Sequence, residues 1–263
     1  MRDWALILGS SSGFGAATSL ALAREGINIV GVHLDRASAL ENVKKLIADI
    51  KSRGVDVKFF NVNAADANKR KEVLDSVEKG DFFLKDDKIK VMLHSLAFGT
   101  LKPYFGEKSE DDIKQQQLEM TIDVMGNSLV YWTQDIVRRG LMIKGGKIFA
   151  MTSSGGHRVI EYYGAVSAAK AVLESHCRQL AMELGSKGIS VNPVLAGVTE
   201  TPALSKIPNA DKIITNALQR NPSHRLTTPQ EVAEIIVAVT KLNNNWMNGG
   251  IIYADGGESA VEL

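Results

Sequence analysis

Residues 153–170 read SSGGHRVIEYYGAVSAAK, and they follow an apolar run at residues 147–152. The apolar run predicts a buried strand, so the quoted stretch leaves the carboxyl end of a strand and enters a helix. A tyrosine hydroxyl there can donate a proton to a developing oxyanion, and a nearby ammonium lowers the tyrosine pKa. Ser153, Tyr163 and Lys170 are therefore the candidate catalytic residues.

The spacing within this stretch indicates the reaction. Tyr163 lies seven residues before Lys170, about two helical turns, and Val166 occupies the position one turn before the lysine. In carbonyl reduction, hydride goes to the carbon that bears the oxygen. In enoyl thioester reduction, hydride goes to C3, and the oxygen that gathers charge is two carbons away. A tyrosine set back from the lysine favours the second reaction, although two residues that merely edge a helix remain an open alternative for this stretch alone.

Composition narrows the class of protein. The 263 residues make one large domain or two small ones, and the 44% hydrophobic content is ordinary for a globular protein. A net charge of +1 gives no electrostatic reason to expect nucleic-acid binding. The single cysteine, Cys177, allows no internal disulfide, and its place in a helical pattern predicts burial. We expect a cytoplasmic protein with no signal peptide, membrane span or metal site.

The amino-terminal segment predicts a site for a pyrophosphate. An apolar run at residues 4–8 is followed by Gly9, Gly13 and Gly15, and a helical pattern covers residues 16–24. Glycines between a strand and a helix let backbone N–H groups approach a phosphate, and the helix dipole favours the negative charge. A simple tight turn is the alternative.

The residues at the end of the second expected strand do not point to one form of the cofactor. His33 is followed by Asp35 and Arg36. An acidic residue in this region binds the adenosine ribose hydroxyls, whereas an arginine accepts a 2′-phosphate. Either side chain could instead cap or flank the amphipathic helix expected at residues 37–51.

Strands and helices alternate along the whole chain. The expected strands cover residues 4–8, 27–32, 57–61, 90–93, 147–152, 189–194 and 251–254, and the expected helices cover 16–24, 37–51, 69–79, 111–139, 165–184 and 229–242. This order predicts an α/β fold: one domain over residues 1–263 with a doubly wound, seven-stranded parallel sheet and helices on both faces. Residues 203–225, polar and interrupted by Pro208 and Pro222, predict an irregular lid over the site.

Two apolar stripes stand out in the longer helical patterns. One runs from Leu118 to Ile136 and the other from Ala169 to Leu184. Core packing accounts for most of both, and a surplus of apolar residues suggests contact with another copy of the chain. Asp123 falls within the first pattern and needs an exposed face or a polar partner.

Four local motifs make the chain similar to the short-chain dehydrogenases/reductases, in the divergent branch of the enoyl-acyl-carrier-protein reductases. Residues 94–97, His-Ser-Leu-Ala, resemble the His-Ser-Ile motif of that branch. Asp123 stands where carbonyl reductases carry an asparagine, and six residues separate Tyr163 from Lys170 as in enoyl reductases. Ala196-Gly197 replaces the usual Pro-Gly.

Two features depart from the commonest enoyl-reductase pattern. The amino-terminal glycines keep the ordinary short-chain spacing, and Ser153 stands where many enoyl reductases have a second tyrosine. A reductase of 3-oxoacyl groups or other ketones therefore remains the alternative enzyme. A dinucleotide-binding sensor without turnover is a third hypothesis, although Tyr163 and Lys170 are both present.

The resemblance implies a role for each matching residue in a Rossmann-type domain. Tyr163 would donate the proton or stabilise the oxyanion, Lys170 would bind the nicotinamide ribose and tune Tyr163, and Ser153 would support the oxyanion. The implied cofactor-binding residues are Gly9, Ser11, Ser12, Phe14, Gly15, His33, Asp35, Arg36, Asn61, Val62, Ser95, Leu96, Ala97, Lys170, Gly197, Thr199 and Thr201. Among these, Asn61 and Val62 would meet adenine.

The resemblance also implies the reaction partners. His33 occupies the strand end where NAD-specific members usually place an aspartate, so Arg36 favours NADP(H) over NAD(H), with Asp35 as the main objection. The substrate would be an acyl thioester on coenzyme A or on acyl carrier protein. By analogy with the superfamily, a homotetramer would form through the two long helices.

Overall fold

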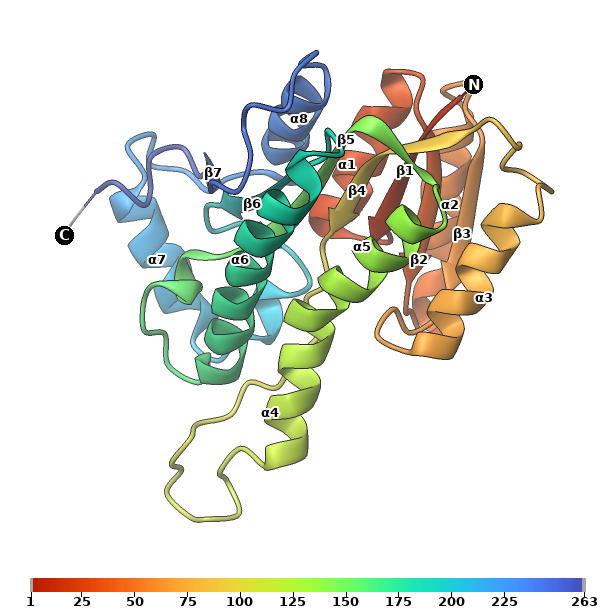
Figure 1. Cartoon of the computed structure of the whole chain (residues 1–263). Coiled ribbons are helices and arrows are strands. Elements are labelled where there is room, and N and C mark those ends of the chain that lie inside the picture. Colours follow the sequence, from red (N-terminus) through yellow and green to blue (C-terminus); the bar gives the residue numbers. More distant parts are fainter. Residues whose placement is uncertain (1, 262–263) are drawn as a thin grey trace.

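Seven parallel strands form the centre of the computed structural model, which describes residues 2–261 (Figure 1). In spatial order they are β3 (Val57–Asn61), β2 (Asn28–His33), β1 (Asp3–Leu8), β4 (Lys88–His94), β5 (Met142–Thr152), β6 (Ser190–Ala196) and β7 (Ile252–Ala254). Every neighbouring pair runs parallel. The predicted seven-stranded parallel sheet is therefore confirmed.

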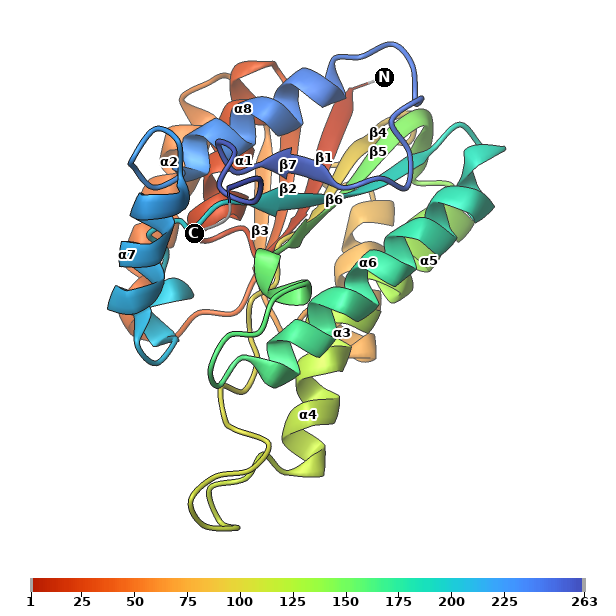
Figure 2. The same cartoon turned by 90° about the vertical axis from the view of Figure 1, so that its left-hand side faces the viewer.

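Helices cover both faces of this sheet, as the two views at right angles make clear (Figures 1 and 2). One face carries α3 (Ala67–Glu78), α5 (Ser128–Arg138) and α6 (Gly164–Gly185), and the other carries α1 (Gly13–Arg24), α2 (Leu40–Lys51) and α8 (Pro229–Thr240). Two shorter helices, α4 (Gln115–Ile122) and α7 (Ala210–Arg220), extend the structure beyond the sheet. The doubly wound arrangement agrees with the sequence.

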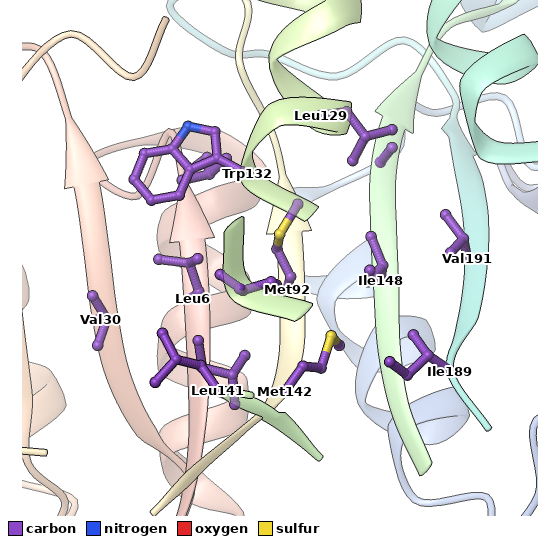
Figure 3. Packing of buried hydrophobic residues seen from close by; sticks show 14 of the residues in the cluster. Leu6, Val30, Met92, Leu129, Trp132, Leu141, Met142, Ile148, Ile189 and Val191 are labelled. Carbon is purple, nitrogen blue, oxygen red and sulfur yellow. The ribbon is translucent and has the colours of Figure 1, made fainter. Parts of the chain in front are cut away.

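The alternation of side chains along β1 explains why the sheet has an apolar cluster on each face. Trp4, Leu6 and Leu8 point into the cluster under α3, α5 and α6, whereas Ala5 and Ile7 point into the cluster under α1, α2 and α8. Figure 3 shows the first of these clusters, in which Leu6 and Trp132 belong to a continuous apolar layer. A central parallel strand must be apolar on both faces, and β1 is.

The strand order also fixes where a ligand can bind. β1 pairs with β2 on one side and with β4 on the other, so the chain crosses over in opposite directions from β1. In an open parallel sheet the carboxyl ends of the strands form a crevice at such a switch point. The loops that follow β1, β2, β4, β5 and β6 are therefore the ones that can build a site.

The apolar stripes lie inside the protein. Leu129, Trp132 and Ile136 of α5 are fully buried, as is Leu173 of α6, and all four pack in the cluster on that face of the sheet. These four side chains account for core packing in that part of the stripes, and the interface between copies of the chain stays a prediction.

The helical pattern at residues 111–139 is not one helix. It resolves into α4, a π-helical turn η2 (Asp123–Asn127) and α5, and residues before 115 form a loop. Gly126 approaches α6 so closely that a Cβ there would lie 3.0 Å from Val172. The widened turn accompanies this close approach, and it changes the direction of every side chain that precedes it.

The segment predicted to be irregular contains a helix. Residues 203–225 include a short 3-10 turn, η4 (Leu204–Lys206), and α7. Pro208 directly precedes the N-cap residue Asn209, and Pro222 directly follows the C-cap residue Asn221, so the two prolines bound the helix and do not break it. Ala217 is the buried residue of this helix.

A buried carboxylate ties the start of the chain to the sheet. Asp87 is buried, and it accepts hydrogen bonds from the Trp4 indole (2.9 Å), the Leu84 backbone N–H (2.9 Å) and the Arg2 guanidinium (2.6 Å). Burial alone raises the pKa of Asp87, but these hydrogen bonds, Arg2 first, hold it well below its ordinary value. Because the folded-state pKa is depressed, the stabilisation is present at neutral pH and is lost as the pH falls.

We predict that Asp87→Asn lowers the free energy of unfolding by about 2 kcal/mol at pH 7, because it leaves buried donors without their anionic acceptor. Urea unfolding measures this difference, which should narrow below about pH 4, where free aspartate becomes protonated. Asp86→Asn is the matched control, because Asp86 is exposed and should change stability by less than about 0.5 kcal/mol. Equal effects of the two substitutions would contradict the role assigned to Asp87.

Candidate functional site

A cavity of about 1270 Å³ opens at the carboxyl ends of the strands. It is lined by most of the residues expected to bind the cofactor: Gly9, Ser11, Ser12, Phe14, His33, Asp35, Arg36, Val62, Ser95, Leu96, Ala97, Gly197, Thr199 and Thr201. The candidate catalytic residues Ser153, Tyr163 and Lys170 line the same cavity. Of the expected residues, Gly15 and Asn61 are outside the lining.

The phosphate turn fits a pyrophosphate on geometric grounds. A Cβ on Gly9 would fall 2.3 Å from the Ser95 carbonyl oxygen, and one on Gly15 would fall 2.1 Å from the Gly9 carbonyl oxygen, so neither position admits a side chain. Gly15 therefore contributes to the site without lining the cavity, because the absence of a side chain there lets α1 begin directly at the turn. Ser12 caps α1 without a side-chain hydrogen bond, which leaves the first N–H groups of the helix free for an anion.

The end of β2 has a more defined structure than its sequence indicates. His33 is buried, and its Nδ1 lies 2.8 Å from Oδ2 of Asp35. Asn61 accepts a hydrogen bond from the Asp35 backbone N–H (2.9 Å) and donates one to the Asp35 carbonyl (3.0 Å). Asn61 therefore holds the turn at residue 35 in place, and its expected contact with adenine stays a prediction. Arg36 is exposed and lines the cavity together with Ser38.

His94, at the end of β4, is a structural residue. It is completely buried and lies outside the cavity lining, with Nε2 2.8 Å from the Ser128 hydroxyl. That hydroxyl donates to the Val124 carbonyl (2.7 Å), so it accepts from His94. Burial, reinforced by the charge of Lys170, lowers the pKa of His94 to about 3. The neutral ring thus connects β4 to the π-helical turn.

Tyr163 sits at the junction between the loop and α6. It is the capping residue before the helix and is 9% exposed. Its ring lies flat on Gly155, where a Cβ would come within 2.6 Å of a ring carbon. Tyr162, which precedes it, has a φ of 62°, a conformation that a non-glycine residue adopts at a cost and that fixes the direction of Tyr163.

Ser153 is the polar side chain beside Tyr163. Burial raises the pKa of Tyr163, and the Ser153 side chain opposes that increase. Ser153 in turn accepts a hydrogen bond from the Gly155 backbone N–H at 3.1 Å. Tuning of Tyr163 by Lys170 stays a prediction. A phenol with a raised pKa stays protonated at neutral pH and can act as a donor.

Lys170 is buried where β5 meets α6. Its Nζ donates to the Met151 carbonyl at 2.7 Å, and burial lowers its pKa to about 8. Glu174, one turn further along α6, opposes this decrease. The Glu174 carboxylate is itself buried, accepts from the Thr152 hydroxyl (2.6 Å), and lies 2.8 Å from the half-exposed ring of His157.

Asp123 does not face the site. Its Oδ1 accepts from the Tyr131 hydroxyl (3.3 Å) and from the Asn127 amide (3.4 Å), and the residue is absent from the cavity lining. The π-helical turn presents Val124 and Met125 to the cavity in its place. This part of the cavity wall is therefore apolar.

The loop after β6 is held by a residue that the sequence analysis missed. Gly197, Thr199 and Thr201 line the cavity as expected. The buried carboxylate of Glu258 accepts a hydrogen bond from the Val198 backbone N–H at 2.9 Å. Glu258 lies near the end of the chain, where no motif or periodicity marks it, so only the folded structure reveals the contact.

The part of the cavity beyond Tyr163 is apolar with a basic margin. Tyr163 belongs to an apolar cluster together with Val124, Met125 and Val166, and further apolar side chains pack against it: Leu101, Met120, Ile160 and Ile207. Basic side chains also line the cavity, namely Arg158, Lys206, Lys212 and Arg220. The sequence did not single out these four basic residues, because they come from separate parts of the chain: the loop after β5, η4 and α7.

Other kinds of site are not found in residues 2–261. No group of three or more histidine, cysteine or acidic side chains is arranged to hold a metal ion there. Within the same residues no helix is both long and apolar enough to cross a membrane. Cys177 is buried, and burial raises the pKa of its thiol far above the ordinary value, so it is unreactive as expected.

Comparisons with known proteins agree with this geometry. Residues 9–259 match the family model described as enoyl-(acyl carrier protein) reductase. The chain is 28% identical to the 3-oxoacyl-[acyl-carrier-protein] reductase FabG of Thermotoga maritima, with 96% of each chain covered. It is 31% identical to the NADH-dependent enoyl-[acyl-carrier-protein] reductase FabI of a Synechocystis strain, over 65% of this chain and 64% of that protein.

The fold has close structural relatives. The enoyl-[acyl-carrier-protein] reductase (NADH) of Aquifex aeolicus superposes with a TM-score of 0.82, at 19% identity, over 99% of this chain and 98% of that one. At this identity the likeness speaks for the fold alone. Together with the family model and the intact serine, tyrosine and lysine set, it leads to one assignment. The chain belongs to the short-chain dehydrogenase/reductase superfamily, in the family described as enoyl-(acyl carrier protein) reductase, and is an oxidoreductase of that superfamily.

Proposed function

We propose that this protein is an NAD(P)H-dependent reductase of 2-enoyl thioesters, carried on coenzyme A or on acyl carrier protein. The observation that carries the proposal is the surroundings of Tyr163. The Tyr163 side chain packs with Val124 and Met125 in one apolar cluster, and Ser153 is the polar side chain beside it. The conjugated acyl group of an enoyl thioester needs an apolar wall and one positioned donor for its carbonyl oxygen.

In the proposed reduction, the cofactor, Tyr163, Ser153 and Lys170 each have a separate role. The reduced nicotinamide supplies the hydride, which goes to C3 of the acyl group. Negative charge then gathers on the thioester oxygen, where the Tyr163 hydroxyl donates a hydrogen bond and stabilises the enolate. Ser153, beside Tyr163, would support the same oxygen. Lys170 would hold the nicotinamide ribose. The enolate would then take a proton at C2 from the Tyr163 hydroxyl, which regains one from solvent, and the saturated thioester results.

Reduction of a 3-oxoacyl thioester is the second candidate. It is favoured by Ser153 at the ordinary short-chain position, by the ordinary spacing of Gly9, Gly13 and Gly15, and by the alignment to FabG over nearly the whole chain. A sensor without turnover has less support, because the structure brings Ser153, Tyr163 and Lys170 into one cavity.

We also propose the setting of the reaction. The superfamily resemblance supports a cytoplasmic homotetramer, although the fully buried side chains of α5 and α6 contribute nothing to that argument. Residues 203–225 remain our candidate for the lid over the substrate, now as a short helix. Ile207 packs against the apolar cluster around Tyr163, and Asn209 donates a hydrogen bond to Glu161 at 3.1 Å.

NADP(H) is the cofactor that we favour over NAD(H). Arg36 lines the cavity at the end of β2 and is exposed, so its guanidinium can reach a 2′-phosphate. The objection raised by Asp35 is weaker than its sequence position suggests, because its carboxylate is engaged by His33 at 2.8 Å.

The substrate test compares crotonyl with acetoacetyl thioester in the presence of each nicotinamide cofactor. We expect kcat/KM to be higher for the crotonyl compound, because Tyr163 is placed for an oxygen two carbons from the hydride-accepting carbon. If the keto substrate is turned over faster by an order of magnitude, the 3-oxoacyl reductase proposal replaces the enoyl one.

Tyr163→Phe should lower kcat roughly a hundredfold or more, the usual effect of removing a positioned proton donor, and leave the Kd of the cofactor nearly unchanged. Lys170→Ala should weaken both cofactor binding and turnover. Tyr253→Phe is the control, because Tyr253 lies exposed on β7 outside the cavity. Steady-state kinetics and cofactor titration separate these effects, and a Tyr163→Phe variant with normal kcat would refute the role of the tyrosine.

Arg36→Ala should raise the KM for NADPH about tenfold or more and leave the KM for NADH within about twofold, because only NADPH offers the guanidinium a phosphate. Arg24→Ala provides the control, since Arg24 is exposed at the end of α1 and outside the cavity. A wild-type preference for NADH would overturn the choice of cofactor.

A further inference from the structure

Two arginines from distant parts of the chain meet at the carboxyl-terminal segment. Arg158, in the loop before Tyr163, donates through Nη2 to the Ser259 carbonyl at 3.1 Å. Arg220, in the last turn of α7, donates through Nη2 to the Glu258 carbonyl at 3.2 Å. The two acceptors are therefore backbone carbonyls of consecutive residues. Both side chains line the cavity.

Most of the donors on these two groups are unused. A guanidinium has five N–H donors, and each arginine donates to one backbone carbonyl. Over residues 2–261, neither forms an ion pair with a carboxylate. Nε of Arg220 is buried without an acceptor in that part of the chain. The other free donors of the two groups are open to an acceptor in the cavity that both side chains line.

The carboxylates close to this pair are already engaged. Oε2 of Glu258 accepts from the Val198 backbone N–H (2.9 Å), and burial raises the pKa of Glu258 while Arg158 opposes the increase. The two oxygens of Asp255 accept from the backbone N–H groups of residues 257 and 259, at 3.1 Å and 2.9 Å. The guanidinium groups therefore keep their capacity for an external anion.

The position of the pair separates it from the cofactor's phosphate site. The phosphate turn is formed by residues 9–15 at the start of α1, whereas the arginines come from the loop after β5 and from α7. The apolar cluster around Tyr163 includes Ile160 from the first of these segments and Ile207 from the stretch before α7. The arginines thus belong to the two segments that enclose the apolar part of the cavity, where the proposed function places the acyl group.

We propose that Arg158 and Arg220 form a subsite for an anionic group of the acyl substrate. The ligand chemistry is an oxyanion that accepts paired hydrogen bonds from guanidinium groups, either a phosphate on a pantetheine-type carrier or a carboxylate at the far end of the acyl chain. This inference rests on the proposed function in that it takes the ligand to be an acyl thioester. It adds that the enzyme selects for a charged one.

Binding of saturated thioesters tests the subsite independently of turnover. Calorimetry on the protein saturated with oxidised cofactor would compare S-butyryl-pantetheine, which is neutral, with S-butyryl-4′-phosphopantetheine and S-glutaryl-pantetheine. At least one charged compound should bind roughly tenfold or more tighter than the neutral one, the effect expected of charge-assisted hydrogen bonds. A phosphate preference assigns the anion to the carrier, and a carboxylate preference assigns it to the acyl chain.

Arg158→Gln and Arg220→Gln should each remove most of this advantage and leave the affinity of the neutral thioester within about twofold. Arg225→Gln is the matched control, because Arg225 is exposed, pairs with Glu231 and lies outside the cavity. Arg158→Lys keeps the charge without the forked geometry, so it should retain part of the advantage and guard against a merely unfolded variant.

Equal affinity of all three thioesters for the wild-type protein would overturn the subsite. So would an equal loss for neutral and charged compounds in both glutamine variants, because the arginines would then be structural only. Failure of the proposed function is visible separately: it would be the absence of crotonyl thioester reduction by the same wild-type preparation, whatever the binding preferences.

Discussion

The burial of one ammonium group governs the arrangement of the site. Lys170 has a pKa of about 8 in the folded chain, below the ordinary value of about 10.4, because burial disfavours its charge. Between these values the unfolded chain holds more protons, so stability increases with pH in that window. At neutral pH the buried charge costs on the order of 3 kcal/mol. The buried charge lies at the junction of β5 and α6, and the residues around it reduce this free-energy cost.

Two consecutive residues at the end of β5 hold α6 in register with that charge. The Met151 carbonyl accepts from Lys170, and the Thr152 hydroxyl donates to Glu174 one turn further along. Gly156 lets the following loop approach, since a Cβ there would lie 3.3 Å from the lysine Cβ. The same loop runs from Ser153 to Tyr163. The positions of the two candidate catalytic hydroxyls therefore depend on the contacts that hold Lys170 and Glu174.

The sequence predicts local features well and distant contacts poorly. The strand ends, the phosphate turn and the Ser153–Tyr163–Lys170 set follow from short-range patterns, and the structure places them as expected. The hydrogen bond between the Asn61 amide and the Asp35 backbone was not predicted, because it joins residues 26 positions apart, which no local pattern encodes. The arginines and Glu258 escaped notice for the same reason. The helix at residues 210–220 was hidden because Pro208 and Pro222, which bound it, look like residues that break it.

The π-helical turn at residues 123–127 has the largest consequence for the chemistry. Helical periodicity gives no warning of one widened turn, yet that turn sends Asp123 toward Tyr131 and brings Val124 and Met125 to the cavity. That part of the cavity wall is therefore apolar, and the Tyr163 hydroxyl, with Ser153 beside it, is the candidate donor for a charged oxygen. Such a site favours a substrate whose charge develops at one oxygen and whose remaining atoms are apolar, as in a conjugated acyl thioester.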